Sequence, residues 1–177
     1  MADPVLRICG SGINMQPAGH HLAELNFGEL RYDWDDPRVA EFVDGLDMVN
    51  AMASRSPGFV WRLSDDDMNK EQTAEGGAFG GIRRMASTLS VWEDAASLEH
   101  FFWNTPHRQF YENRAQWHDS VGNSNLVVWW VPVGQKPKVK EGLSRFAQMQ
   151  GQGQSHSAPC WDWVKGAIQS QRGPEKG

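Results

Sequence analysis

Apolar and polar residues alternate with two different periods along the chain, and these periods predict strands and helices. Runs that alternate, or that are apolar throughout, predict strands, because successive side chains of a strand point to opposite faces of a sheet. Such runs occupy residues 21–27, 58–63, 83–93 and 125–133. The last run, NLVVWWVPV, is almost continuously apolar, which is typical of a strand covered on both faces.

A helical period follows the first predicted strand. Asp36 can cap a helix that has Pro37 at its first position, and the Ser-Pro-Gly at 56–58 would end it. Between these signals the apolar residues recur three, four and seven positions apart, at Val39, Phe42, Val43, Leu46 and Val49. This spacing predicts an amphipathic helix.

A second helix is predicted in two pieces. Asp94 can cap the first piece, which runs to Phe102, and Thr105 with Pro106 can restart the helix as far as about His118. The polar, glycine-rich stretch 64–81 predicts a long loop, and a short helix is expected at 139–149.

The order strand, helix, strand, strand, helix, strand predicts an α+β fold of the ferredoxin-like type, a four-stranded antiparallel sheet with both helices on one face. The expected organisation is an N-terminal arm at 1–20, a barrel-forming domain at 21–149, and a linker with a C-terminal tail at 150–177.

Strand parity separates a mixed face from an apolar one. Alternate positions of the first and third strands give an apolar set that is the better core: Ala23, Leu25, Phe27, Met85, Leu89 and Val91. The opposite set is mixed: Leu22, Glu24, Asn26, Thr88, Ser90 and Trp92. We expect the mixed face to be free of helices and to close a cavity against a second copy of the chain, which predicts a homodimer.

Composition narrows the function classes. A net charge of −5 and a pI of about 5.6 argue against nucleic-acid binding. No apolar run is long enough for a membrane span, and the first 20 residues lack the features of a secretory signal, so a cytoplasmic protein is expected. No zinc, phosphate-loop, dinucleotide or serine-triad motif is found, and no metal site is predicted. Nine tryptophans favour an aromatic-lined cavity or interface.

Several motifs carry a resemblance to a known family. They are the segment HLAELNFGELRYDWDDPRVAEFVDGLDMVNAMASRSPGFVWRL, then LSVWEDAASL, FFWNTPHRQFYENRAQW and LVVWWVPVGQKPKVKEGLSRF. With these motifs, residues 20–147 resemble the domain-of-unknown-function family 3291. More distantly, the SVWEDAASLEHF stretch is similar to the antibiotic-biosynthesis-monooxygenase group of dimeric α+β barrels. That likeness implies a cofactor-free oxygenase, a heme protein, or an isomerase, lyase or binding protein.

The resemblance also bears on single residues. Heme-degrading members of the wider group use an Asn on the first strand with a Trp and a His on the second helix. Asn26 matches the first, but Phe101 and Tyr111 stand where the other two would be. The chain departs from that pattern, although Tyr111 or His107 could still ligate a heme iron.

Four residues are candidates for catalysis. His107, near a helix start, should have its pKa lowered by the helix dipole and act as a neutral base or ligand; alternatively it packs the break at Pro106. Asn26 could hold an oxygen or a carbonyl, or bond to a neighbouring strand. Glu24 could be a base, or be solvated near the sheet edge. Tyr111 could move a proton.

The candidates for substrate binding are mainly strand aromatics. Their alternative role is core packing, and only one of the adjacent Trp129 and Trp130 can face a cavity. The expected binding set is His21, Trp61, Thr88, Ser90, Trp92, Trp103 and Trp129.

The sequence therefore predicts a monooxygenase-like enzyme that acts on a hydrophobic small molecule, aromatic or polyunsaturated, without a cofactor. Two alternatives stay open, a heme-binding protein or heme-dependent enzyme, and a non-catalytic small-molecule-binding module.

Overall fold

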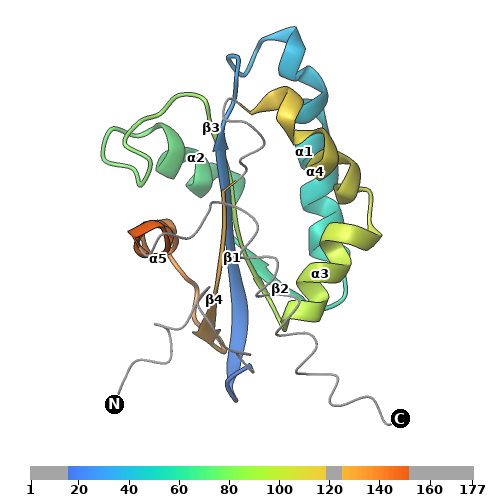
Figure 1. The fold of residues 1–177 in the computed structure, drawn as a ribbon, viewed down its shortest axis with the longest axis vertical. Helices are drawn as coiled ribbons and strands as arrows, with labels where there is room; N and C mark the ends of the chain where they lie inside the picture. The colour runs from blue at the N-terminus through green and yellow to red at the C-terminus, as the bar shows by residue number, and fades with distance from the viewer. Residues whose placement is uncertain (1–15, 119–124, 152–177) are drawn as a thin grey trace.

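A four-stranded antiparallel sheet lies at the centre of the computed structural model, which describes residues 16–118 and 125–151 (Figure 1). The strands are hydrogen-bonded in the order β2-β3-β1-β4. They are β1 (His20–Glu29), β2 (Phe59–Arg62), β3 (Met85–Trp92) and β4 (Asn125–Pro132). The predicted α+β class and the four strands are confirmed. The first 15 residues of the expected arm, and the linker and tail beyond residue 151, lie outside the described residues.

Three helices cover one face of the sheet (Figure 1). They are α1 (Ala40–Arg55), which follows a 3-10 turn at Pro37–Val39, α3 (Ala95–Asn104) and α4 (His107–Trp117). The expected caps are present: the side chain of Asp36 accepts from the Arg38 N–H, and that of Asp94 accepts from the Ser97 N–H. These side chains satisfy N–H groups that the first turn of a helix leaves unpaired.

The other face of the sheet carries α2 (Asp65–Thr73) and α5 (Val139–Gly151) (Figure 1). Helix α5 packs closely: a Cβ built on Gly142 would lie 2.7 Å from Leu25 Cδ2, and Phe146 meets Phe27 edge to face at 5.0 Å. The two helices predicted at 37–55 and 95–118 do share one face of the sheet, but the expectation that the other face carries no helix was wrong. The short helix expected at 139–149 is present, and it supplies part of the second layer.

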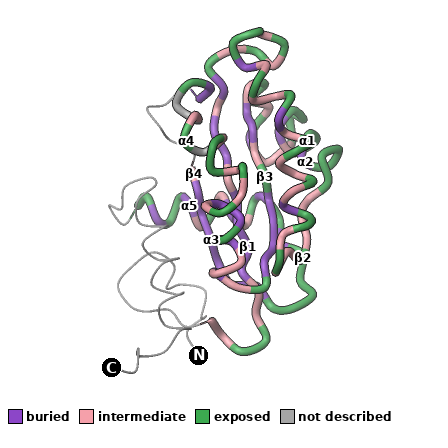
Figure 2. Tube along the Cα trace, turned by 90° about the vertical axis from the view of Figure 1, so that its right-hand side faces the viewer, coloured by how far each residue is buried: buried purple, intermediate pink, exposed green. Residues whose placement is uncertain are grey.

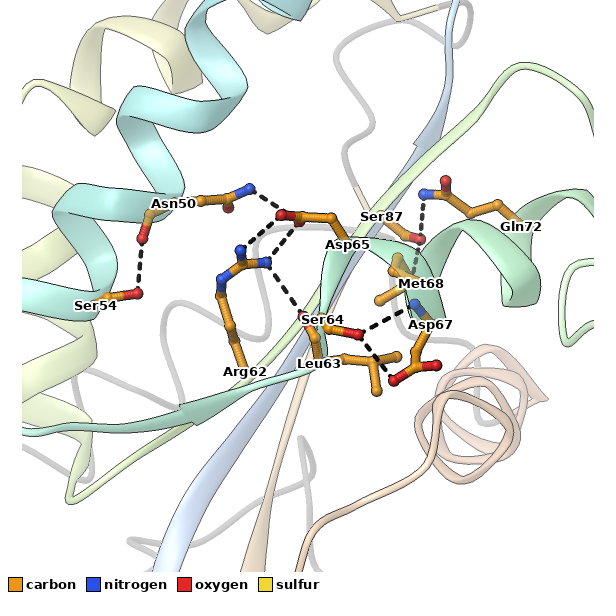
Figure 3. A network of polar contacts seen from close by, with 10 residues as sticks. All are labelled: Asn50, Ser54, Arg62, Leu63, Ser64, Asp65, Asp67, Met68, Gln72 and Ser87. Atoms are coloured by element: carbon orange, nitrogen blue, oxygen red, sulfur yellow. Dashed lines mark hydrogen bonds and ion pairs between the residues drawn. The ribbon is translucent and has the colours of Figure 1, made fainter.

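Helix α2 replaces the first half of the loop predicted at 64–81. Ser64 caps it by accepting from the Asp67 N–H at 3.2 Å, and the acidic first turn suits the positive end of the helix dipole. Met68 and Gln72 are buried. The Gln72 amide donates to Ser87 Oγ on β3 at 2.8 Å, which attaches the helix to the sheet (Figure 3).

The two sheet faces are the reverse of the expected arrangement. The mixed face, with Glu24 and Ser90, lies under α1, α3 and α4, where Trp92 stacks on Phe101 of α3 at 5.1 Å. The apolar face lies under α2 and α5. Strand parity correctly separated the two sets of residues, but the prediction that the mixed face is free to meet a second copy was wrong. Figure 2 shows that β1, β3 and β4 are buried along most of their length.

No helix within residues 16–118 and 125–151 is long and apolar enough to cross a membrane.

Candidate active site

A cavity of about 340 Å³ lies between the mixed face of the sheet and helices α1, α3 and α4. Its floor comes from β1 and β3, and its walls are largely aromatic. The aromatic side chains that line it are Trp34, Phe42, Phe59, Trp92, Phe101, Phe102, Phe110 and Trp117. Such a space, apolar with a few polar groups, is the usual form of a small-molecule site.

The mouth of the cavity is marked by its exposed lining residues, Asp47, Asp65 and Thr88. Strand β2 ends at Arg62, so beyond it no other strand of the described residues pairs with this edge of β3, and the cavity continues over the edge. Met68 and Gln72 of α2 line the cavity there.

Glu24 is a buried carboxyl on the floor of the cavity. Its strand, β1, lies between β3 and β4, and the residue is only 4% exposed. The expectation that Glu24 is solvated near the sheet edge was therefore wrong. Burial raises the pKa of Glu24 to about 7, and the hydrogen bond from Ser90 lowers it only in part. Near neutral pH both the acid and the carboxylate are populated, so this group could act as a base or as an acid.

Ser90 holds one oxygen of this carboxyl, and Trp92 in turn holds Ser90. The Ser90 hydroxyl donates to Glu24 Oε2 at 2.7 Å, and the Trp92 indole N–H donates to Ser90 Oγ at 2.9 Å. Ser90 lies directly opposite Glu24 on the neighbouring strand, and Trp92 follows two positions along β3 on the same face.

His107 begins α4 and lies in the aromatic wall. Thr105 Oγ1 accepts from the His107 backbone N–H at 3.2 Å, as at the start of a helix. The imidazole centroid is 4.7 Å from that of Phe101 and 4.4 Å from that of Phe102. Burial lowers the pKa of His107 to about 4, which the Phe102 backbone opposes only in part. The ring is thus neutral at pH 7, as predicted, but burial rather than the helix dipole is the main cause.

A polar network crosses the mouth of the cavity (Figure 3). The Arg62 guanidinium donates to both carboxylate oxygens of Asp65, at 2.7 and 2.8 Å, and Asn50 Nδ2 donates to Asp65 Oδ1 at 3.3 Å. The Arg62 hydrogen bond lowers the pKa of Asp65. The network ties α1 to the segment that joins β2 and α2. The sequence did not indicate it, because Asp65 was expected in a loop.

The structure brings six of the predicted site residues to one cavity. They are Glu24, Asn26, Thr88, Ser90, Trp92 and His107. Asn26 lies two positions beyond Glu24 on the same face of β1, opposite Thr88. Tyr111 lies in α4, but its side chain is outside the described part of the chain.

Four predicted binding residues do not line this cavity: His21, Trp61, Trp103 and Trp129. The first, second and fourth occupy the opposite face of the sheet, by their register with Val131, Val91 and Ala23. There, Trp129 Nε1 donates to Glu141 of α5 at 3.1 Å. Trp103 is half-buried on α3.

Apart from His107, the helix residues of the wall were missed as site residues. Phe42 belongs to the helical stripe that the sequence predicted, but that stripe indicated packing against the sheet. A hydrophobic period does not reveal where a helix leaves space beneath it. His118, which is buried and lies 5.5 Å from Phe42 between ring centroids, was likewise not singled out for this wall.

Within the part of the chain that the structure describes, no group of three or more His, Cys, Asp or Glu residues could hold a metal ion.

Comparisons with known proteins identify a family. The model of the family Domain of unknown function (DUF3291) matches residues 21–172. None of the curated proteins matches the chain. A crystal structure of a protein of unknown function from Nitrosomonas europaea is similar, with 13% identity and a TM-score of 0.41, over 69% of this chain and 97% of that one. A likeness at this level carries no argument about function.

Proposed function

The chain belongs to the DUF3291 family, and from its cavity we propose that it is an enzyme that removes a proton from a flat, hydrophobic small molecule. The substrate class is aromatic or polyunsaturated, and the reaction is of the cofactor-independent monooxygenase type. One observation carries the proposal: a carboxyl with its pKa raised to about 7 lies on the floor of an aromatic-lined cavity.

Glu24 is the general base of the proposed reaction. Its carboxylate takes a proton from an activated C–H or O–H group of a ligand that lies against the aromatic walls. Asn26, on the same face, is placed to orient an oxygen atom of the substrate or of O₂. Neutral His107 adds no charge to the wall, which suits a neutral ligand.

The electrons for the reaction come from the substrate. Loss of a proton from an activated methylene leaves a carbanion, which reduces molecular oxygen directly. Conversion of CH₂ to C=O removes four electrons, and O₂ accepts them, with one oxygen atom entering the product and the other leaving as water. The protein must therefore deprotonate the substrate and shield it from solvent.

The type of fold and the oligomeric state are also part of the proposal. The strand order β2-β3-β1-β4 supports a ferredoxin-like arrangement, and we propose that the chain forms a homodimer. Since helices cover both sheet faces, the contact would involve surfaces other than the mixed face. A molar mass from light scattering equal to that of one chain would contradict the homodimer.

Anthrone, a flat three-ring compound with an activated methylene, is the probe for this activity. We expect oxygen uptake with anthrone that falls at least about 100-fold in Glu24→Gln, the scale of a lost general base. Glu41→Gln, at an exposed position of α1, is the control and should keep the activity. Uptake by Glu24→Gln at the unchanged rate would contradict the proposal. Anthrone binding without turnover would favour a binding module instead.

A heme protein is the second candidate, and one observation favours it. His107 lines the cavity with a neutral imidazole, the form that ligates iron, so this residue would hold a heme iron. Heme would supply redox chemistry at that position. Titration with hemin separates the two candidates: a Soret band at stoichiometric hemin that is lost in His107→Ala supports the heme protein, and no band removes it.

A further inference from the structure

We infer that Ser90 and Trp92 are positioning residues: they hold Oε2 of Glu24, so that the carboxyl exchanges its proton through its other oxygen, Oε1. The ligand that meets Oε1 presents a single acidic hydrogen. This inference rests on the proposed function, since it concerns the same carboxyl. It gives Ser90 and Trp92 a different role from the one that the sequence suggested, which was contact with the substrate.

The direction of the hydrogen bonds follows from the chemistry of the three groups. An indole N–H can only donate, so Trp92 donates to Ser90 Oγ. The hydroxyl then has one hydrogen to give, and Glu24 Oε2 at 2.7 Å is its acceptor. If Glu24 carried its own proton on Oε2 and donated to Ser90, the serine hydrogen would lose its acceptor. Oε2 therefore accepts in both protonation states.

Trp92, Ser90 and Glu24 form a relay of two hydrogen bonds, and their positions in the sheet make this relay rigid. Glu24 and Ser90 are opposite each other on hydrogen-bonded strands, and Trp92 is 1% exposed. The Trp92 indole stacks on Phe101 at 5.1 Å and meets Phe59 edge to face at 5.5 Å. The aromatic packing fixes the indole, and the indole in turn fixes the serine hydroxyl.

The remaining oxygen defines the class of ligand. Among the described residues, the Ser90 contact at Oε2 is the hydrogen bond that Glu24 makes, which leaves Oε1 for a ligand in the cavity. The walls around this carboxyl are largely aromatic, and the imidazole of His107 beside them is neutral. The site therefore suits an uncharged weak acid, such as a phenol or an activated methylene, better than a guanidinium or amidinium cation.

The direct test measures Glu24 itself, without any substrate. The carboxyl carbon of Glu24 is followed by ¹³C NMR against pH, with the signal assigned by its loss in Glu24→Gln. Ser90→Ala removes a hydrogen bond that favours the carboxylate, so we expect the pKa of Glu24 to rise by about one unit or more. Trp92→Phe should raise it by less, and Ser90→Thr, which keeps the hydroxyl, should restore the value of the unaltered protein.

Other ionisable groups line the same cavity and are common to all these variants: His107 from α4, His118 directly after that helix, Asp47 from α1, and Arg62 with Asp65 at the mouth. Differences between variants therefore report on the relay.

An unchanged or lowered pKa of Glu24 in folded Ser90→Ala would overturn the inference, and so would a failure of Ser90→Thr to restore it. A second arm compares 2-naphthol with 2-naphthamidine, two-ring compounds that differ in the donor group. Tighter binding of the amidine by the unaltered protein would contradict the ligand class. Because the titration needs no turnover, it can succeed or fail independently of the anthrone assay.

Discussion

Glu24 and Asn26 line the floor of the cavity from β1, and Ser90 on the neighbouring strand holds the Glu24 carboxyl. Their spacing of two positions placed both on one face of the first strand, together with Thr88, Ser90 and Trp92 of the third, and the structure brings all five to one cavity. The sequence could not tell which face the helices cover, because a period of two shows which residues share a face but not what packs on that face. It also could not supply the burial that sets the pKa of Glu24.

Adjacent tryptophans show the limit of reasoning about single residues. Parity correctly stated that Trp129 and Trp130 point to opposite faces, but neither lines the cavity. Trp129 is fully buried against α5 instead. Whether an aromatic side chain of a strand packs in the core or lines a site depends on how closely a helix packs above it. The pattern of residues along the strand does not contain this information.

At the scale of elements, the two helices on the outer face of the sheet explain most of the difference from expectation. Helix α2 has one aliphatic side chain, Met68, in nine residues, so no hydrophobic period marks it; its signals are the Ser64 cap and an acidic first turn. Helix α5 was expected, but not its contact with the sheet. That contact depends on Gly142, which lets the helix approach Leu25 and Trp129.

The close approach of α5 gives a prediction. Gly142→Ala places a methyl group 2.7 Å from Leu25 Cδ2 and 2.9 Å from the Trp129 ring, inside a packed layer. We expect a loss of about 1–3 kcal/mol in the free energy of unfolding, the usual effect of overpacking. Urea unfolding followed by circular dichroism measures it.

Gly151→Ala is the matched control at the end of the same helix, because among the described residues no atom beyond its chain neighbours and its own helix backbone lies within 4 Å of the added Cβ. Alanine favours a helix over glycine, so this variant should be neutral or slightly more stable. Equal stability of the two variants would show that α5 does not pack on the sheet as described.

At the scale of the whole molecule, two buried ionisable groups line the cavity, and their contributions to stability change in opposite directions with pH. The pKa of Glu24 is raised to about 7, so the folded protein binds this proton more tightly, and its contribution to stability falls as pH rises from about 4.5 to about 7. The pKa of His107 is lowered to about 4, so its contribution is present above about 6.5 and is lost as pH falls toward 4. Between about 4.5 and 6.5 the two trends oppose each other.

Variants separate these two trends. The stability of Glu24→Gln relative to the unaltered protein should increase by about 3 kcal/mol between pH 4 and pH 8, since a shift of one pKa unit corresponds to about 1.4 kcal/mol. The stability of His107→Asn relative to the unaltered protein should increase by a similar amount as pH falls from 7 to 4. Urea titrations at several pH values measure both, and differences that do not vary with pH would contradict the assigned burial.

The central claim is that Glu24 lies in the cavity as a carboxyl that titrates near neutral pH. The most direct measurement is a ¹³C NMR titration of the glutamate carboxyl carbons in the unaltered protein, with the Glu24 signal identified by its absence in Glu24→Gln. The account predicts a midpoint near pH 7. A midpoint near 4.5, the ordinary value for a glutamate, would show that Glu24 is solvated and would remove the proposed base from the site.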